Sequence, residues 1–115
     1  MTADCLFCKI ANDQLPATRV YEDDTVIAFR DINPQAPLHV LIVPRRHITT
    51  TNDLTPDDGP LLAAIFNVAR KIAADEGVAE SGYRLVFNCN SDGGQSVYHI
   101  HLHLLAGRPL AWPPG

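Results

Sequence analysis

The sequence predicts an α+β domain in which a five-stranded antiparallel sheet carries one long helix and one short helix. Five short β-prone runs are joined by turn-rich connections, which favours antiparallel pairing. One long stretch between the third and fourth runs has apolar residues at helical spacing. A chain of 115 residues suffices for one hydrophobic core, so residues 1–115 are expected to form a single domain.

The runs expected to form strands are separated by turn signals. Two of them flank Asp23 and Asp24, an arrangement typical of a β-hairpin. The connection between the last two, residues 90–96, is rich in Gly, Asn and Ser and is expected to be a loop. The five runs are Thr18–Glu22, Thr25–Arg30, Leu38–Val43, Tyr83–Cys89 and Val97–Leu105.

The long helix is expected to start at Thr55, because residues 55–58 supply an N-cap, a proline at the first helical position and two acidic residues in the first turn. Apolar residues recur at helical spacing up to Ala73, and Gly77 is expected to end the helix. The short helix is expected at about Phe7–Asn12.

The net charge of the chain limits the classes of partner that it can bind. A formal net charge of -4 and a pI near 5.6 argue against a protein that binds a nucleic-acid polymer, which needs many Lys and Arg to neutralise phosphates. A single nucleotide is compatible, because backbone N–H groups and imidazoles can hold one or two phosphates. No N-terminal leader and no membrane-length apolar run are recognised, so we expect a cytoplasmic protein without a membrane partner.

Three of the five histidines, His99, His101 and His103, alternate with apolar residues in the fifth run. On a strand they would project from one face. Imidazole can act as nucleophile, acid, base or metal ligand, so the alternation indicates either a metal site or phosphoryl chemistry. The structural alternative is a half-buried strand whose polar face happens to be histidine.

The loop Gly93-Gly94-Gln95-Ser96 directly precedes these histidines. Its glycines let a backbone approach a ligand closely, and its N–H groups, amide and hydroxyl suit phosphate oxygens. A Gly-Gly pair by itself is usually only a turn. Its position beside the histidines indicates a phosphate-binding loop.

Cys5 and Cys8 form a C-x-x-C pair in a chain with three cysteines. In a reducing compartment this spacing indicates metal or redox chemistry rather than a structural disulfide. The pair by itself is a weak metal signal, because a tetrahedral ion needs two more ligands. Two small buried side chains are the alternative.

The segment Asn88–Leu105 resembles the signature of the histidine triad family, H-φ-H-φ-H-φ-φ with φ apolar. Within that family it is similar to the nucleotide-binding, purine nucleoside phosphoramidase branch. Cys89-Asn90 departs from the pattern, because relatives commonly carry Gly at the second position. The resemblance also covers Phe7–Ile10, Asp31–Pro37, Pro44–Ile48 and Trp112–Gly115.

The resemblance implies a two-fold homodimer with the long helix and the strand near Val86 at the interface. It implies hydrolysis of adenosine or guanosine 5′-phosphoramidates at the P–N bond, with His101 as nucleophile and a nucleotidyl-histidine intermediate. The bound partner would be a purine nucleoside monophosphate or its phosphoramidate. His103 and His39 are candidates for holding phosphate oxygens, and Ser96 is a candidate for contacting the leaving group.

The resemblance also implies a nucleotide-binding set. Asp31 would bind the ribose hydroxyls, although an Asp before Asn-Pro is more often a turn residue. The base pocket would consist of apolar side chains that would otherwise be assigned to the core: Phe7, Ile10, Phe29, Ile32 and Leu41. The set is completed by Asn88, Gly94, Gln95, Ser96, His101 and His103.

Some members of this family complete a C-x-x-C metal site with two histidines. The matching residues here are Cys5, Cys8, His47 and His99, so the resemblance implies one structural zinc ion. In that case His99 is a metal ligand, and the catalytic histidines are His101 and His103.

Three other functions remain open from the sequence. A sister branch that shares the triad hydrolyses dinucleoside polyphosphates, although Ser96-Val-Tyr-His99 and the tail Trp112–Gly115 favour the phosphoramidase branch. A nucleotide-binding regulator with incidental hydrolysis is a second alternative. A third is a catalytic zinc site built from the three strand histidines, which would need an open fourth position on the metal.

Overall fold

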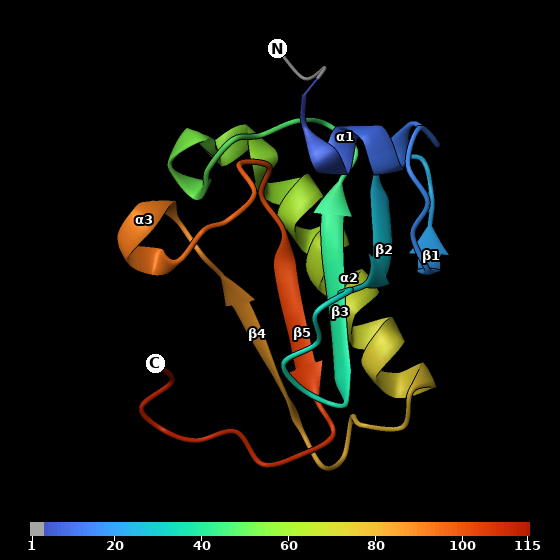
Figure 1. Cartoon of the computed structure of the whole chain (residues 1–115), viewed down its shortest axis with the longest axis vertical. Helices are drawn as coiled ribbons and strands as arrows, with labels where there is room; N and C mark the ends of the chain where they lie inside the picture. Colours follow the sequence, from blue (N-terminus) through green and yellow to red (C-terminus); the bar gives the residue numbers. More distant parts are fainter. Residues whose placement is uncertain (1–3) are drawn as a thin grey trace.

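The computed structural model describes residues 4–115, so the first three residues of the expected domain lie outside the described residues. Figure 1 shows one sheet with the long helix α2 behind it. In chain order the elements are α1 (Leu6–Ala11), β1 (Arg19–Glu22), β2 (Val26–Arg30), β3 (Leu38–Pro44), η1 (Thr51–Asp53), η2 (Pro56–Asp58), α2 (Gly59–Asp75), β4 (Tyr83–Phe87), α3 (Asn90–Gly93) and β5 (Leu102–Ala106).

The five strands form one sheet in the order β1-β2-β3-β5-β4, and each neighbouring pair is antiparallel. This confirms the predicted α+β fold. The register pairs Phe29 with Leu41, and Leu41 with His103. Three neighbouring strands therefore present these side chains in one row across the sheet.

The two faces of the sheet are both covered. On one face, Val40, Ile42 and Leu104 pack against Ile65 and Ile72 of α2 in the larger core cluster. On the other face, a second cluster joins strands β2 and β3 to α1, which lies near the carboxyl end of β3 (Figure 1). It consists of Phe7, Ile10, Ala11, Ile27, Phe29, Leu41 and Val43. The short helix expected at about Phe7–Asn12 is therefore present as α1, and its apolar side holds it to the sheet.

The predicted turn and helix signals are confirmed. Asp23 Oδ1 accepts the N–H groups of Thr25 and Val26, both at 2.8 Å, and closes the β1–β2 hairpin. Thr55 caps the helical segment through a capping box with Asp58, although the first turn is the 3-10 helix η2 and α2 itself starts at Gly59. Gly77 follows the helix with φ 75°, the left-handed conformation that glycine adopts most easily.

The fifth strand is shorter than predicted. Residues 97–101 were expected to be extended, but β5 starts at Leu102. Pro44 has no N–H, and its carbonyl accepts a hydrogen bond from the ring of His99 at 2.7 Å. The β3–β5 ladder therefore ends at the pair Ile42 and Leu102. Ile100 N–H instead donates to Ile48 O at 2.8 Å.

Two boundaries near the histidines also differ from the prediction. β4 ends at Phe87, so Asn88 and Cys89 are not part of it. The loop expected at residues 90–96 contains the single-turn helix α3, which ends at Gly94 in the left-handed conformation with φ 81°. Asp, Asn, Gly and Ser favour turns, and their composition does not distinguish a loop from one helical turn.

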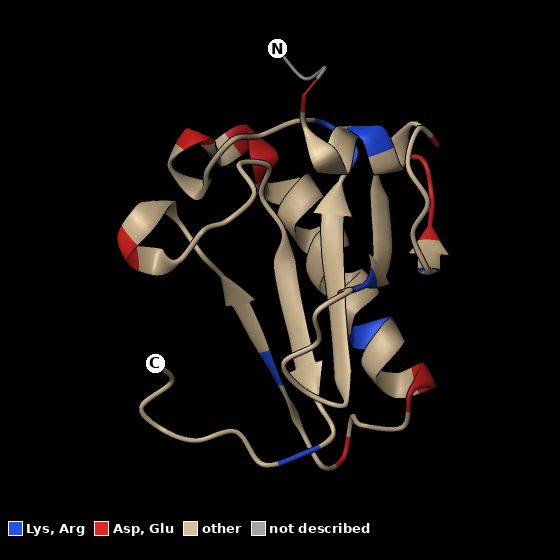
Figure 2. Cartoon of the chain, viewed as in Figure 1, with Lys and Arg blue, Asp and Glu red and all other residues tan. Residues whose placement is uncertain are grey.

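Charged side chains are absent from the two central strands. β3 and β5 contain no Lys, Arg, Asp or Glu, and the charged residues lie mainly on loops, helices and outer strands (Figure 2). The titratable groups of the central strands are therefore the imidazoles of His39 and His103. Among residues 4–115, none of the helices has the length and apolar character that crossing a membrane requires.

Candidate active site

A cavity of about 320 Å³ lies between α1, the loop after it and the sheet face that carries Phe29 and Leu41. It brings together the following residues predicted for the nucleotide site: Phe7, Ile10, Phe29, Asp31, Ile32, Leu41, Ser96, His101 and His103. Other lining residues were not predicted: Leu6, Leu15, Pro16, Ala17, Arg30 and Val97. The loop residues among them carry no motif, and only the packing of residues 15–17 beside α1 places them there.

The other predicted nucleotide-site residues, His39, Asn88, Gly94 and Gln95, do not line this cavity. Ile32, by contrast, is 99% exposed at its mouth. Apolar side chains dominate the lining, and the polar groups come from the sheet and from the segment before β5. The shape and chemistry suit a flat apolar ring with a polar end.

The imidazole of His101 is held in one orientation. It is buried, and its Nδ1–H donates to the carbonyl of His99 at 2.8 Å. The ring of Phe7 stands edge-on to it, with ring centroids 5.0 Å apart. Because Nδ1 carries the proton, Nε2 keeps its lone pair. Burial lowers the pKa of His101, and the His99 carbonyl and Asp31 oppose this shift.

A chain of hydrogen bonds connects His39 to His103. The backbone N–H of Gln35 donates to His39 Nδ1 at 3.0 Å, so the proton of neutral His39 is on Nε2. That nitrogen lies 2.9 Å from His103 Nδ1, to which it donates, and 3.5 Å from Asp31 Oδ2. His103 then carries its own proton on Nε2. No feature of the sequence pointed to the part played by Gln35.

Burial keeps both of these imidazoles neutral. It is the main cause that lowers the pKa of His103 to about 4, with smaller contributions from His101 and His39. Burial also lowers the pKa of His39, and Asp31 opposes the shift. The rings of His101 and His103 are 4.9 Å apart between centroids, so protonation of either would oppose protonation of the other.

Asp31, His39 and His103 also lie close enough together to be considered as metal ligands. The hydrogen bonds argue against that use, because His39 accepts a hydrogen bond at Nδ1 and carries its proton on Nε2. It would have to lose that proton to offer Nε2 to a cation. We therefore interpret this cluster as a hydrogen-bond chain.

Gln95 holds the loop of residues 93–96 in place through hydrogen bonds. Its side-chain amide donates to the carbonyls of Thr49 and Val97, at 2.8 and 3.1 Å. Its Oε1 accepts the N–H of Asn90 at 2.9 Å, and its own N–H donates to the Asn90 carbonyl at 3.0 Å. All the N–H groups of Gln95 are therefore used within the protein. Ser96, the next residue, is exposed and lines the cavity.

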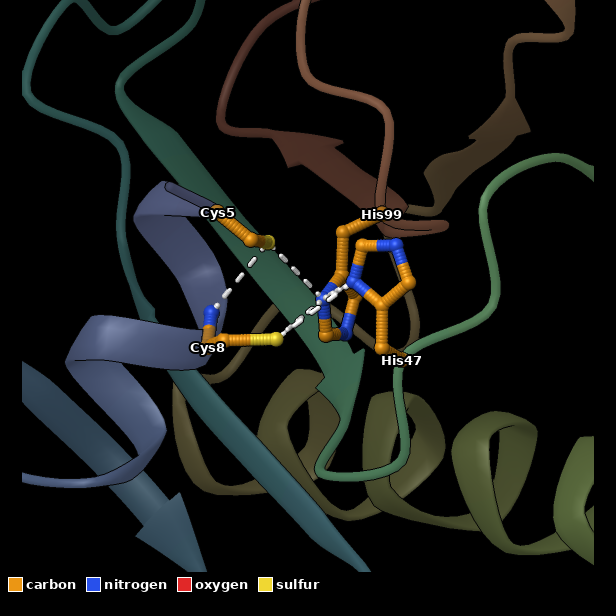
Figure 3. Close-up of side chains that lie close together, drawn as sticks. All are labelled: Cys5, Cys8, His47 and His99. Atoms are coloured by element: carbon orange, nitrogen blue, oxygen red, sulfur yellow. Dashed lines mark hydrogen bonds between the residues drawn. The ribbon is translucent and has the colours of Figure 1, made fainter. Parts of the chain in front are cut away.

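A second cluster lies beside the cavity and could hold a metal ion. Cys5 and Cys8 project from α1, His47 from the segment after β3 and His99 from the segment before β5, and the four side chains point toward one another (Figure 3). His99 Nδ1 lies 3.2 Å from Cys5 Sγ, 3.5 Å from Cys8 Sγ and 3.2 Å from His47 Nδ1. Cys8 Sγ is 3.4 Å from His47 Nδ1.

These separations fit a shared tetrahedral ion. Zinc bond lengths of about 2.05 Å to nitrogen and about 2.3 Å to sulfur give N–N and N–S edges of about 3.3 and about 3.5 Å. The proton positions fit as well. His99 Nε2–H donates to the Pro44 carbonyl, so Nδ1 directs a lone pair at the other three groups. Burial is also the main cause that lowers the pKa of His99, to about 4, which keeps this ligand neutral.

The structure thus separates the three histidines of the predicted stripe. His99 lies in the cluster with the two cysteines, whereas His101 and His103 face the cavity. The prediction that all three project from one face of a strand was wrong, because only His103 lies in β5. The alternative of a zinc site made from all three histidines finds no support in this arrangement.

The comparisons with known proteins agree with this geometry. Residues 4–109 match the family model described as "Scavenger mRNA decapping enzyme C-term binding". The purine nucleoside phosphoramidase of Escherichia coli (strain K12) is 53% identical over 110 residues, which are 96% of this chain and 92% of that protein.

Two solved structures have the same fold. A HIT family hydrolase from Legionella pneumophila Philadelphia 1 superimposes with a TM-score of 0.96 at 62% identity, covering 97% of this chain and 100% of that one. A histidine triad protein from Clostridium difficile gives a TM-score of 0.92 at 48% identity, covering 95% of each chain. The chain therefore belongs to the histidine triad family, as a hydrolase of that family.

Proposed function

We propose that the protein hydrolyses the P–N bond of adenosine or guanosine 5′-phosphoramidates through a nucleotidyl-histidine intermediate. The observation that carries this proposal is the orientation of His101, whose Nδ1–H is fixed on a carbonyl and whose Nε2 is left as a nucleophile beside the cavity. The name of the relative from Escherichia coli supports the same substrate class.

The cavity divides into subsites for the substrate. Its apolar end, with Phe7, Ile10, Phe29, Ile32 and Leu41, would take the purine. Asp31 would accept hydrogen bonds from the ribose hydroxyls through Oδ2, because Oδ1 already accepts the N–H of Asn33 at 2.8 Å. The phosphate would then lie beside the histidines.

The reaction proceeds in two displacements at phosphorus. His101 Nε2 forms a bond to phosphorus while the P–N bond to the amine breaks, and the departing amine takes a proton from solvent. Water then attacks phosphorus and gives up a proton to solvent, which releases the nucleoside monophosphate and returns the neutral imidazole. His103 Nε2–H would donate to a phosphate oxygen, and Ser96 would contact the leaving amine.

The hydrogen bonds suggest supporting roles for three predicted residues that do not line the cavity. His39 would act as a positioning residue that keeps the His103 proton on Nε2, rather than as a phosphate ligand. Gln95 would fix the loop that presents Ser96. Gly94 gives this loop its left-handed turn. Asn88, between β4 and α3, stays a candidate phosphate contact that a substrate complex would test.

We also propose that Cys5, Cys8, His47 and His99 hold one structural zinc ion. Four protein ligands complete a tetrahedron, so the ion would supply structural stability and would not activate water. Within residues 4–115 the cysteines form no disulfide, which fits a reducing, cytoplasmic location.

A homodimer is the proposed assembly. β4 is an edge strand whose five residues are only partly buried, and Phe66 of α2 is 41% exposed where its ring packs against Phe87. An edge strand and an adjoining apolar helix surface are typical of an interface across a two-fold axis.

The substrate class is tested by steady-state hydrolysis of a panel. We expect an adenosine 5′-phosphoramidate and its guanosine counterpart to be cleaved with similar kcat/KM, because the apolar cavity offers few polar groups to read base edges. A diadenosine polyphosphate should react far more slowly. Faster cleavage of the polyphosphate would assign the protein to the other hydrolase class.

His101→Gly should lower kcat by at least about three orders of magnitude, because no other group can form the covalent intermediate. Binding of AMP, measured by calorimetry, should change little. Free imidazole should restore part of the activity if the ring is the attacking group. Substantial turnover by a folded His101→Gly protein would exclude the mechanism.

Protein stability should decrease with acid through His103. Its pKa is about 4 in the folded protein and near 6.5 in the unfolded chain, so the unfolded state binds more protons between these values. The free energy of unfolding should therefore fall as pH is lowered through this window. In urea titrations at about pH 7.5 and about pH 5, His103→Gln should lose less stability than the parent protein. An equal decrease in the free energy of unfolding of both proteins would contradict a neutral, buried His103 in the folded state.

Protein purified without chelator should contain about one zinc ion per chain, and Cys5→Ser/Cys8→Ser should contain less than about a tenth of an ion. Removal of zinc should lower the melting temperature, because the cluster ties α1 to the segments around β3 and β5. Elemental analysis and thermal unfolding measure both effects. A metal-free parent protein with reduced thiols would refute the zinc site.

Light scattering at micromolar concentration should give about twice the chain mass of 12.6 kDa. Phe66→Glu, which places a charge on the exposed helix surface, should shift the mass toward that of one chain. A parent protein that is already monomeric would rule out the proposed assembly.

A further inference from the structure

We propose that Cys5 and Cys8 form a thiol switch: their oxidation to a disulfide withdraws both sulfur ligands from the metal cluster and weakens nucleotide binding in the adjoining cavity. This inference rests on the proposed metal site and adds regulation to it. Two connections between the cluster and the cavity carry it.

The first connection is α1, which serves both sites. Cys5 caps the helix and Cys8 lies in its first turn, while Phe7 between them lines the cavity. The Phe7 ring contacts the rings of Phe29 and His101, with centroid distances of 5.4 and 5.0 Å. A shift of the cysteines therefore moves a wall of the base pocket.

The two ends of α1 are held differently. At the carboxyl end, Arg19 donates to the carbonyl of Ile10 at 2.6 Å and Arg45 donates to that of Ala11 at 2.9 Å. At the amino end, the cysteine side chains contact His47 and His99 of other segments. Loss of the sulfur ligands therefore removes these contacts from the end of the helix that carries Phe7.

The second connection is His99, which belongs to both sites through different atoms. Its ring lies between the cysteines and the Pro44 carbonyl, and its side chain is fully buried. Its own carbonyl accepts the Nδ1–H of His101 at 2.8 Å. A change at the cluster therefore reaches the group that orients the proposed nucleophile.

The oxidation is a thiol–disulfide exchange with a small-molecule disulfide. The Cys5 thiolate, which is more exposed than buried Cys8, attacks one sulfur of the reagent and releases one small thiolate. The Cys8 thiolate then attacks Cys5 sulfur, forms the intramolecular S–S bond and releases the second small thiolate. Two electrons pass from the cysteines to the reagent, and the two small thiolates take up protons from water. His47 and His99 remain as only two of the four ligands.

The test uses the zinc-loaded 115-residue chain carrying Cys89→Ser, which leaves Cys5 and Cys8 as its cysteines. Oxidised glutathione is the oxidant. We expect loss of both thiols, release of about one zinc ion per chain to a chromogenic chelator, and a Kd for AMP that rises about tenfold by calorimetry. Reductant together with zinc should restore the original Kd.

The matched control is Cys5→Asp in the same background. Its carboxylate can replace one sulfur as a zinc ligand, but no intramolecular disulfide can form. Addition of the oxidant should change neither the zinc content nor the Kd for AMP that this variant has in the reduced state. Equal zinc loss from the control would overturn the switch, because the loss would not depend on the disulfide.

Four outcomes with the Cys89→Ser protein separate the failures. Retention of zinc under oxidation, or an unchanged Kd for AMP after zinc release, overturns the switch and leaves the proposed enzyme intact. Absence of zinc from the reduced protein refutes the metal site and the switch with it. Failure of the reduced, zinc-loaded protein to bind AMP refutes the proposed nucleotide function.

Discussion

The hydrogen bond between His99 Nε2–H and the carbonyl of Pro44 is the contact on which the site depends. It occupies the acceptor that would otherwise extend the β3–β5 ladder, so the chain joins the sheet only at Leu102, after His101. It fixes the proton of His99 and directs the Nδ1 lone pair toward the cysteines. It also sets the position of the His99 carbonyl, which orients His101. Because His99 is fully buried, an unpaired ring N–H there would be costly.

Side chains alternate between the two faces of the sheet, so one face stabilises the fold and the other carries groups of the candidate site. One face of β3 and β5 is apolar and packs on α2, while the other presents Leu41, His39 and His103. The absence of charged residues from these strands leaves the imidazoles as their only titratable groups. Burial keeps them neutral and lowers the pKa of His103 to about 4, so they can serve as hydrogen-bond donors or acceptors without first losing a proton.

Hydrogen bonds determine which ring nitrogen carries the proton in His39, His101 and His103. The N–H of Gln35 determines which nitrogen of His39 carries the proton, and His39 does the same for His103. The carbonyl of His99 determines it for His101. Backbone groups therefore determine the protonation pattern, and the side chains transmit it. Substitutions that shift the backbone near residue 35 or residue 99 are expected to alter the chemistry without touching a proposed catalytic group.

The sequence by itself determined the strand number, the hairpin at Asp23 and the capped long helix, and the family resemblance implied the four clustered metal-type ligands. Periodicity, turn residues and motif spacing are local signals, and they can be recognised without a structure. The start of β5, the separation of His99 from His101 and the engagement of Gln95 and His39 in internal hydrogen bonds were decided by the tertiary structure. These features depend on partners up to tens of residues away, such as the Pro44 carbonyl, and a pattern within one segment carries no information about which distant group will accept its hydrogen bonds.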